Sequence, residues 1–454
     1  MYFLYSVLFT LGIIVLLPRV VVDALRHGKY VAGLRERLGQ LPAIETKGRP
    51  VIWLHCVSVG ETQAARPLVN ELVQKFPTHA LVVSTVTLTG HNLAREVFSE
   101  QASAIIYFPL DWAWTVRRAL KCIKPSAVLI METELWPRFL RECRKRKVPV
   151  AIVNGRLSEK SFRNYKLIRS FISSLLNNLD LALMQTEADA GRIRSLGLAP
   201  DRVVVSGNIK FDSGVAIEQQ TLTEEIRERF KLEDARPLIV AASTHMPEER
   251  ITLEAFKQLR ASLPTPPRLL LAPRHPERFA EAATLLDSTG LRWARRSNPY
   301  DETDRDCDVI LLDSIGELRA VYPLATIVFV GGSLTRTGGH NILEPAAAGA
   351  CIITGAHTFN FTAIIRAFLE ADALVQLSAL TESEATHALA EAFLDLLTNA
   401  ERRTALAATA RAVCERNRGA TARTIKLLAP LLSETQERGA LLQARGARPD
   451  ALSA

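Results

Sequence analysis

Cysteine is scarce in this chain: six residues among 454, scattered and without a CxxC pair. A disulfide framework is typical of small secreted proteins, and a zinc site needs closely spaced ligand pairs, so neither is indicated. We therefore expect reduced thiols in a cytosolic body. Glycine (23) and proline (22) also fall well below the level typical of disordered or collagen-like chains, and no repeat of fixed period is present.

Two sequence fingerprints of nucleotide-binding proteins are missing as well. The chain contains neither GxGxxG nor GxxxxGK[ST], so it predicts neither a dinucleotide-binding Rossmann motif nor a P-loop. Acidic residues are somewhat fewer than basic ones: 48 Asp and Glu against 56 Lys and Arg give a net charge of +8. This excess makes an anionic partner plausible without naming one.

The N-terminal stretch, residues 1–17, is apolar and carries no charge. As a helix it would extend roughly 26 Å, just under a bilayer core of about 30 Å, and Val20 to Val22 would let it span. Lys and Arg follow this stretch instead of preceding it, which argues against a cleaved signal peptide and favours a cytoplasmic location for the rest of the chain. We predict a retained inner-membrane anchor at 1–22, either spanning or lying in the interface; a helix buried in the fold is the alternative.

Beyond the anchor, short apolar runs alternate with amphipathic stretches, as in βαβ units with a parallel sheet. Because 454 residues exceed what one core usually supports, we expect two α/β domains. The expected divisions are 23–211, a linker at 212–235, 236–430, and a tail at 431–454 that is frayed from Glu437 onward. Predicted strands are Val51–Val57, Ala80–Ser84, Ser103–Phe108, Ala127–Met131, Pro149–Asn154, Leu181–Gln185, Val203–Ser206, Pro237–Ala242, Arg268–Ala272, Asp308–Leu312, Ile327–Gly331 and Cys351–Thr354.

Acidic residues follow two of these strands. Glu61 lies in the segment SVGET between the first strand and an amphipathic helix, and Glu132 and Glu134 lie in METELWP. Side chains at the carboxyl edge of an open α/β sheet face the ligand crevice, where one carboxylate can act as a base and another can orient or stabilise charge. By spacing alone, each acid is equally well explained as a helix-capping residue.

Basic groups follow other strands. Lys210, in GNIKFD, lies close to the expected hinge and could stabilise a leaving phosphate, or be an exposed hinge lysine. The stretch from Arg144 to Arg169 suits an anionic lipid or phosphate, although charge runs are usually solvated faces. Arg274 follows a strand and suits bidentate phosphate binding, and the glycine-rich segments at 331–333 and 338–345 could cradle a phosphate with backbone N–H groups.

Taken together, these segments resemble the 3-deoxy-D-manno-octulosonic acid (Kdo) transferases of Gram-negative bacteria. The blocks SVGET, METELWP, NGRLS, GNIKFD, STH, PRHPERF and GGSL…GGHNILEP occur in the family's order up to about residue 425. The resemblance implies a GT-B fold with two Rossmann-like domains facing across a cleft. It also implies transfer of Kdo from CMP-Kdo, with inversion, to a tetraacylated lipid A precursor at the cytoplasmic face of the inner membrane.

The same resemblance assigns roles to residues. Glu61 matches the general base, and Glu132 and Lys210 match transition-state stabilisers. The matching CMP-binding residues are Pro273, Arg274, Ile315, Gly316, Glu317, Asn341, Leu343 and Glu344. The binding blocks contain no DxD-like metal site, so we expect no catalytic metal. We also expect no cofactor and no nucleic-acid partner, and the acceptor's phosphates are candidate partners for the basic stretch. Ile342 and Pro345 depart from the family's residues, which affects only local donor contacts.

Two rival interpretations remain at this point. A sugar-nucleotide epimerase shares the fold and pairs carboxylates with a nucleotide cleft, but such enzymes are soluble and the N-terminal stretch argues against one. A membrane-tethered nucleotide-binding scaffold would have lost catalysis, whereas Glu61, Glu132 and Lys210 are all retained here.

Overall fold

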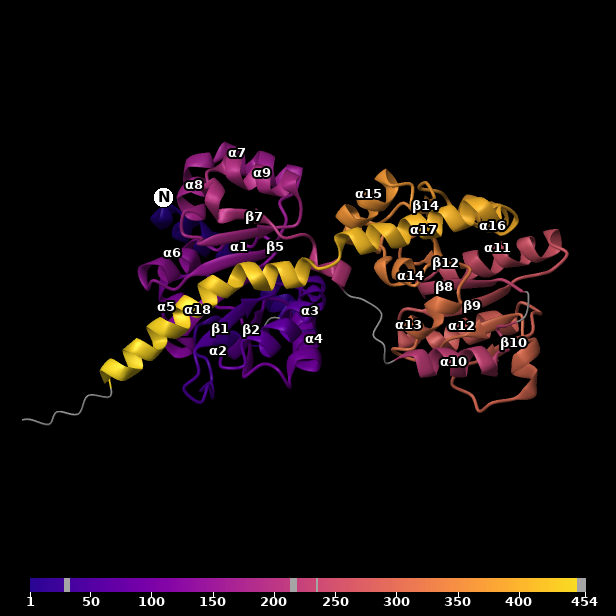
Figure 1. Ribbon diagram of the computed structural model, residues 1–454, viewed down its shortest axis with the longest axis horizontal. Coiled ribbons are helices and arrows are strands. Elements are labelled where there is room, and N and C mark those ends of the chain that lie inside the picture. Colours follow the sequence, from indigo (N-terminus) through magenta and orange to yellow (C-terminus); the bar gives the residue numbers. More distant parts are fainter. Residues whose placement is uncertain (28–32, 213–218, 234–235, 447–454) are drawn as a thin grey trace, which may run out of the picture. The chain divides into compact units, whose positions relative to one another are not determined.

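The computed structural model describes residues 1–27, 33–212, 219–233 and 236–446, which form two compact units. The first unit combines Met1–Asp212 with the segment from Arg418 onward, and the second covers Ser213–Asn417. Each unit is an α/β structure built on one parallel sheet (Figure 1). The chain therefore leaves the first unit once and returns to it at its C-terminal end.

The sheet of the first unit has the strand order β3-β2-β1-β4-β5-β6-β7, all parallel. Its strands are buried on both faces, which explains their continuous apolar sequences. Among the described residues they are β1 (Val51–His55), β2 (Ala80–Thr85), β3 (Ala104–Tyr107), β4 (Pro125–Met131), β5 (Val150–Gly155), β6 (Leu181–Met184) and β7 (Val203–Val205).

Helices cover both faces of this sheet. One apolar core joins the sheet to α3, α4 and α18, and the other joins it to α5, α6, α8 and α9. The helices of this unit are α1 (Tyr2–His27), α2 (Leu34–Arg37), α3 (Val59–Lys75), α4 (Leu88–Phe98), α5 (Ala113–Ile123), α6 (Pro137–Lys145), α7 (Glu159–Leu167), α8 (Arg169–Leu176), α9 (Glu187–Leu196) and α18 (Ala420–Gly446), with short 3₁₀ turns η1 (Pro200–Arg202) and η2 (Ile209–Asp212).

The second unit has a sheet of the same type, in the order β10-β11-β9-β8-β12-β13-β14. Its strands are β8 (Leu238–Thr244), β9 (Arg268–Pro273), β10 (Trp293–Arg295), β11 (Val309–Leu311), β12 (Ile327–Val330), β13 (Cys351–Thr354) and β14 (Val375–Gln376). Its α-helices are α10 (Gln220–Arg229), α11 (Glu248–Ser262), α12 (Phe279–Asp287), α13 (Leu318–Val321), α14 (Leu343–Ala347), α15 (Thr362–Glu370), α16 (Glu382–Thr398) and α17 (Ala400–Asn417). One core of this unit packs α11, α12, α16 and α17 on the sheet.

All twelve predicted strands are present, with ends within two residues of the expected positions. Two strands were not predicted: β10 and β14, which are two or three residues long and form the outer edges of the second sheet. Edge strands this short carry no readable apolar pattern, and β10 includes the charged Arg295.

The C-terminal boundary differs from the sequence expectation. The second unit ends at Asn417, not at residue 430, and α18 extends to Gly446 through a segment that was expected to be frayed. Figure 1 shows α18, in yellow, lying along the first unit. The physical reason is the apolar stripe of α18, which completes one core of that unit through Ala420, Ile425, Leu428 and Leu432. Residues 447–454 of the expected tail lie outside the described residues.

Candidate active site

The first sheet reverses its direction of winding between β1 and β4. From β1 the chain winds outward to β2 and β3, and from β4 it winds the other way to β5, β6 and β7. Loops at the carboxyl ends of such neighbouring strands diverge and leave a crevice, which is where open α/β sheets bind ligands. The segment that carries Glu61 follows β1, and the segment that carries Glu132 follows β4.

Glu61 lies in the first turn of α3 and is buried, with 7% of its surface exposed. One carboxylate oxygen accepts a hydrogen bond from the Val57 backbone N–H at 2.8 Å, and the other accepts one from the Ser58 hydroxyl at 3.2 Å. Both contacts point the carboxylate back over the turn between β1 and α3. The capping interpretation is therefore part of the geometry, because Glu61 does satisfy one N–H group at this helix start.

The electrostatic setting of Glu61 goes beyond capping. Burial, together with the negative charges of Glu132 and Glu134, raises its pKa to about 8, although the two hydrogen bonds oppose the shift. A helix cap has no need for a raised pKa, whereas a general base works best when its pKa lies near the working pH. Burial and Glu132 also raise the pKa of Glu134. The three acids thus form one interacting group at the crevice.

Glu132 occupies an unusual backbone conformation. It follows β4 directly with φ at +54°, a region that non-glycine residues rarely adopt. Its backbone N–H still donates to the Val153 carbonyl of β5 at 2.9 Å. Strain of this kind persists where the surrounding structure holds it, and it is concentrated at functional sites.

Lys210 brings a positive charge to this acidic group. Its Nζ atom lies 3.4 Å from a carboxylate oxygen of Glu132, and both side chains are partly exposed. The turn that carries Lys210, η2, is fixed to β5 because the Ile209 N–H donates to the side-chain oxygen of the buried Asn154 at 3.1 Å. The structure therefore brings Glu132 and Lys210 into contact across 78 residues of sequence. The sequence did not predict this positioning role for Asn154. Its place in the NGRLS block was the only sign that the residue is functionally important.

The basic stretch from Arg144 to Arg169 is less available to an anionic ligand than its charge suggests, because several of its cations pair with acids. The run at 144–147 ends α6, and three of its cations pair with acids: Arg144 with Asp180, and Lys145 and Arg146 with Glu142. Although burial opposes it, hydrogen bonds from Arg117 and Arg146 lower the pKa of Glu142 to about 2. Two carboxylates therefore offset part of the positive charge at this helix end.

The N-terminal helix α1 packs on the first unit through one face. Trp112 donates to Thr10 at 2.9 Å, Arg138 donates to Ser6 at 2.7 Å, and Tyr2 and Tyr5 meet the ring of Phe171. These contacts recur every three or four residues, so they define a single side of the helix. The opposite side is aliphatic and aromatic and is exposed at Phe3, Leu4, Val7, Leu8, Leu11, Ile14 and Val15.

This packing bears on the predicted anchor. Within the part of the chain that the structure describes, no helix is both long and apolar enough to cross a bilayer. The spanning form of the anchor therefore finds no support. The polar groups of Ser6 and Thr10 are used for docking on the body of the unit instead.

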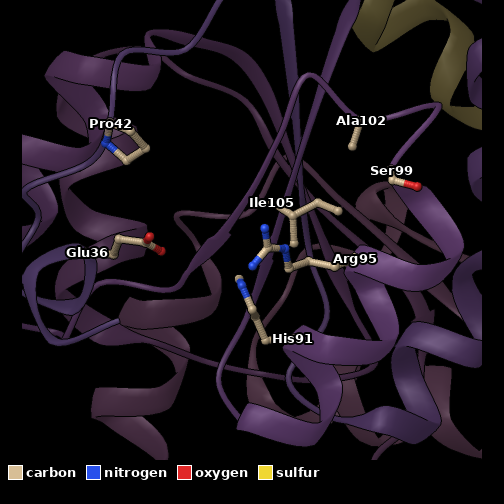
Figure 2. Close-up of a pocket in the computed structure, with 7 residues that line it drawn as sticks. All are labelled: Glu36, Pro42, His91, Arg95, Ser99, Ala102 and Ile105. Carbon is tan, nitrogen blue, oxygen red and sulfur yellow. The ribbon is translucent and has the colours of Figure 1, made fainter. Parts of the chain in front are cut away.

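A cavity of about 380 Å³ lies at the β3 edge of the first sheet. Figure 2 shows the Arg95 guanidinium and the His91 ring pointing toward its centre, with the Glu36 carboxylate opposite. The His91 ring stacks on Tyr107 at 4.1 Å between centroids. The preceding Gly90 lies against the backbone of Ser58, where an added Cβ would be 3.2 Å from the carbonyl carbon. Burial and the charges of Arg95 and Arg37 lower the pKa of His91 to about 4, so the charged groups that line the cavity are Arg95 and Glu36.

In the second unit, the predicted donor-binding residues follow neighbouring strands at one sheet edge. Pro273 ends β9, and the Arg274 N–H donates to the Thr244 carbonyl at the end of β8. The 315–317 segment follows β11, with Ile315 exposed at its tip. Parallel strands place these groups, and the loop after β12, on the same side of the sheet.

Contacts tie the donor segments together. Arg319 donates to Glu344 at 2.7 Å, and the Asn341 side chain donates to the same carboxylate oxygen at 3.2 Å. The Leu343 N–H donates to the Asn341 side-chain oxygen, and Glu317 binds Arg296 through both carboxylate oxygens. Two carboxylates of the matching CMP-binding set, Glu317 and Glu344, are therefore already oriented by arginines.

In the first of the two glycine-rich segments after β12, the backbone donors are already engaged. The N–H groups of Gly332, Ser333 and Leu334 all donate to the carboxylate of Glu248, at 2.7 to 2.9 Å, and the His245 N–H donates to it at 3.0 Å. Glu248 lies at the start of α11 and is fully buried. An internal anion thus occupies the donors that a ligand phosphate would need. The backbone N–H groups of this segment do bind an anion, as the glycine-rich pattern predicts. That anion is the carboxylate of Glu248, a side chain of the same unit.

Glu248→Ala should lower the free energy of unfolding by about 2–5 kcal/mol, because four buried N–H groups lose their acceptor. Chemical denaturation of the variant and of wild type checks this. Glu254→Gln is the matched control, since Glu254 is an acid on the same helix whose contact is a surface pair with Lys257. Equal stability of Glu248→Ala and wild type would contradict the bonding described here.

No group of three or more His, Cys, Asp or Glu residues arranged to hold a metal ion occurs within the described ranges. The chemistry of both edges is instead that of carboxylates, a lysine, arginines and histidines.

Comparison with known proteins extends these observations. A family model described as 3-deoxy-D-manno-octulosonic-acid transferase (kdotransferase) matches residues 32–213. The chain is 35% identical over 409 residues to the 3-deoxy-D-manno-octulosonic acid transferase of Haemophilus influenzae, covering 90% of this chain and 93% of the relative. It is 37% identical over 381 residues to the corresponding transferase of Bordetella pertussis, covering 83% and 86%.

Among solved structures, the chain is similar in fold to a UDP-GlcNAc 2-epimerase from Neisseria meningitidis bound to UDP-GlcNAc. The TM-score is 0.53 at 16% identity, over 85% of this chain and all of that one. A glycosyltransferase from Rickettsia africae gives a TM-score of 0.52 at 11% identity, over 85% and 99%. These likenesses concern the fold alone, two parallel-sheet α/β domains, and do not distinguish a transferase from an epimerase.

Proposed function

The chain belongs to the 3-deoxy-D-manno-octulosonic acid (Kdo) transferase family, and we propose that it transfers Kdo from CMP-Kdo to a tetraacylated lipid A precursor with inversion. It is a glycosyltransferase of lipopolysaccharide biosynthesis. The proposed base-assisted transfer is supported by one observation above all: a buried carboxylate of raised pKa lies near a lysine–carboxylate pair at the winding reversal of the first sheet.

Glu61 is the proposed general base. In an inverting transfer, the acceptor hydroxyl attacks the anomeric carbon of Kdo while the bond to the CMP phosphate breaks, and the hydroxyl proton must go to a base. With its pKa raised to about 8, Glu61 is a stronger base than an ordinary carboxylate, and it can accept the proton in the fraction of molecules in which it is deprotonated. Its anchoring by Val57 and Ser58 holds it at a fixed orientation, which reduces the entropy lost on reaching the transition state.

Lys210 and Glu132 are the proposed stabilisers of the transition state. Negative charge builds on the CMP phosphate as its bond to Kdo breaks, and a fixed ammonium group stabilises this charge. Glu132 holds the ammonium group in place at 3.4 Å and presents its own negative charge to the sugar, whose anomeric carbon becomes electron-deficient. The strained backbone at Glu132 is consistent with a position selected for function.

The donor nucleotide is assigned to the second unit. Arg274, the segment 315–317 and the residues Asn341 to Glu344 follow strands at one sheet edge, and Glu344 is held by hydrogen bonds from Arg319 and Asn341. Glu344 and Glu317 keep oxygens oriented for ribose or base groups, and Arg274 is exposed and suits the phosphate.

The acceptor is an amphipathic lipid, so the enzyme must work at a membrane surface. The exposed apolar face of α1 suits an interfacial helix that lies in the inner leaflet while its other face binds the body of the unit. We propose this interfacial attachment, with the body on the cytoplasmic side, as the form that the predicted anchor takes.

Replacing both Leu8 and Leu11 by Glu should reduce binding to anionic phospholipid vesicles about tenfold or more, because two exposed leucines would no longer enter the acyl region. Vesicle co-sedimentation measures this. Activity on detergent-dispersed acceptor should change little. Leu369→Glu, at an exposed leucine of the second unit, is the control. Undiminished vesicle binding by the double variant would exclude this face as the membrane contact.

The overall proposal is tested by incubating the purified protein with a CMP-Kdo-generating system and a lipid A precursor and measuring product mass. A shift by whole Kdo units is expected. Binding of CMP without any shift would withdraw the acceptor assignment and the role of Glu61.

A further inference from the structure

Three strand ends of the second sheet carry a histidine that has no role in the proposal above. His245 follows β8, His275 follows β9, and His340 lies in the loop between β12 and α14. In the sheet, β8 lies between β9 and β12. The chain winds away from β8 and β12 in opposite directions, so this is the winding reversal of the second sheet and the expected place for a ligand.

The rings of His245 and His340 are parallel and meet through their Nε2 atoms. Their Nε2 atoms are 2.7 Å apart, the ring planes differ by 3°, and the centroids are 5.0 Å apart. The ring of His275 meets that of His245 edge-on, with centroids 5.2 Å apart. Gly332 makes room for the pair, because a Cβ there would lie 2.9 Å from the His340 ring.

The hydrogen bond between the two Nε2 atoms limits the charge that the histidine pair can carry. A hydrogen bond between two imidazole nitrogens holds one proton, so the pair is either neutral or carries a single positive charge. Burial lowers the pKa of His340 to about 3, and His245, Arg274 and His275 add to this effect. Burial and His275 also lower the pKa of His245, with Glu249 opposing. Without an anion, the pair is neutral at physiological pH.

The groups around the pair favour an anion. Arg274 and His275 are exposed at the end of β9. Arg278 is held by Glu249 through two contacts of 3.3 and 3.2 Å, and the carboxylate of Glu248 accepts four backbone N–H groups. The two acids that face the pair are therefore already engaged, and Arg274 supplies an exposed positive charge.

We propose that His245, His340 and Arg274 form a phosphate site for the donor nucleotide, and that the histidine pair takes up one proton when the phosphate binds. This inference rests on the proposed function. A phosphate dianion stabilises the imidazolium form, so the pair passes from neutral to singly charged. Side chains thereby bind the phosphate. The N–H groups of Gly332, Ser333 and Leu334 cannot do so, because they already donate to Glu248.

Isothermal titration of the full-length protein with CMP at pH 7.5, in two buffers of different ionisation enthalpy, measures both affinity and proton uptake. We expect wild type to take up close to one proton per CMP. His340→Gln should lose this uptake and bind CMP about tenfold to a hundredfold more weakly. Cytidine, which lacks the phosphate, should bind both proteins equally and without proton uptake.

His245→Gln serves as the second variant, and circular dichroism checks that each variant is folded. His387→Gln, at an exposed histidine of α16, is the matched control and should behave as wild type. CMP binding that ignores both His245 and His340, or an equal loss of cytidine binding, would overturn this inference and leave the proposed function standing. Failure of wild type itself to bind CMP would overturn both.

Discussion

Glu61→Gln should abolish Kdo transfer, with a fall in kcat of about a hundredfold to ten-thousandfold, while CMP binding is retained. Gln keeps an oxygen that can accept the N–H of Val57 but cannot take up the acceptor hydroxyl proton. Product formation by mass spectrometry and CMP binding by titration measure the two effects separately. Glu71→Gln, on the same helix, is the control. Joint loss of transfer and CMP binding would show a structural role.

The same variant should also change how stability depends on pH. In the folded protein the pKa of Glu61 is raised from 4.5 to about 8. Between these two values the folded state holds a proton that the unfolded state has released, so stability falls as pH rises through this window. Gln has no such titration. Denaturation at pH 6 and pH 9 should therefore show Glu61→Gln gaining stability relative to wild type at the higher pH.

The titration of Glu61 should affect wild-type activity in the direction opposite to its effect on stability. Because the base must be deprotonated to act, kcat/KM should rise with pH toward an apparent pKa near 8. The residue that costs stability at alkaline pH is the one that confers activity there. This opposition between stability and activity is common at active sites.

Lys210→Met should lower kcat about a hundredfold to a thousandfold, because a fixed positive charge no longer meets the charge that develops on the leaving phosphate. The variant also leaves Glu132 without its partner at 3.4 Å. The unbalanced charge of Glu132 should then raise the pKa of Glu61 further and move the pH–rate profile to higher pH.

This shift of the pH profile distinguishes catalysis from packing, since a merely structural lysine would leave it in place. Lys257→Met is the matched control, because Lys257 pairs with Glu254 at 3.3 Å on the surface of the second unit. Lys210→Arg should recover part of the activity by keeping the charge. A Lys210→Met enzyme with unchanged kcat and an unchanged profile would remove Lys210 from the mechanism.

Strand positions were predictable from the sequence for a physical reason. In a parallel sheet covered on both faces, every side chain of a strand is buried, and β1 reads VIWLH with all five residues buried. Residues that follow such strands fall at one sheet edge, which is why Glu61, Glu132 and Arg274 could be placed before the structure was known. The acid–lysine contact required the spatial order of β4, β5 and β7, which the sequence does not state.

Other features could not be read from local pattern. The carboxylate of Glu248 meets N–H groups 84 to 86 residues away, so the glycine-rich loop was interpreted as open to a ligand. The N-terminal stretch is uncharged throughout, which hid the fact that one of its faces is a packing surface. The only sequence signal was the spacing of Ser6 and Thr10 by one helical turn.

The return of α18 to the first unit has a consequence for the order of events during translation. The segment 1–212 leaves the ribosome well before Ala420, Ile425, Leu428 and Leu432, which complete one of its cores. The second unit, by contrast, is one continuous stretch that can finish folding as soon as Asn417 has emerged. A nascent chain halted after Asn417 would therefore carry a finished second unit and a first unit with an uncovered apolar groove, a natural target for chaperones and proteases.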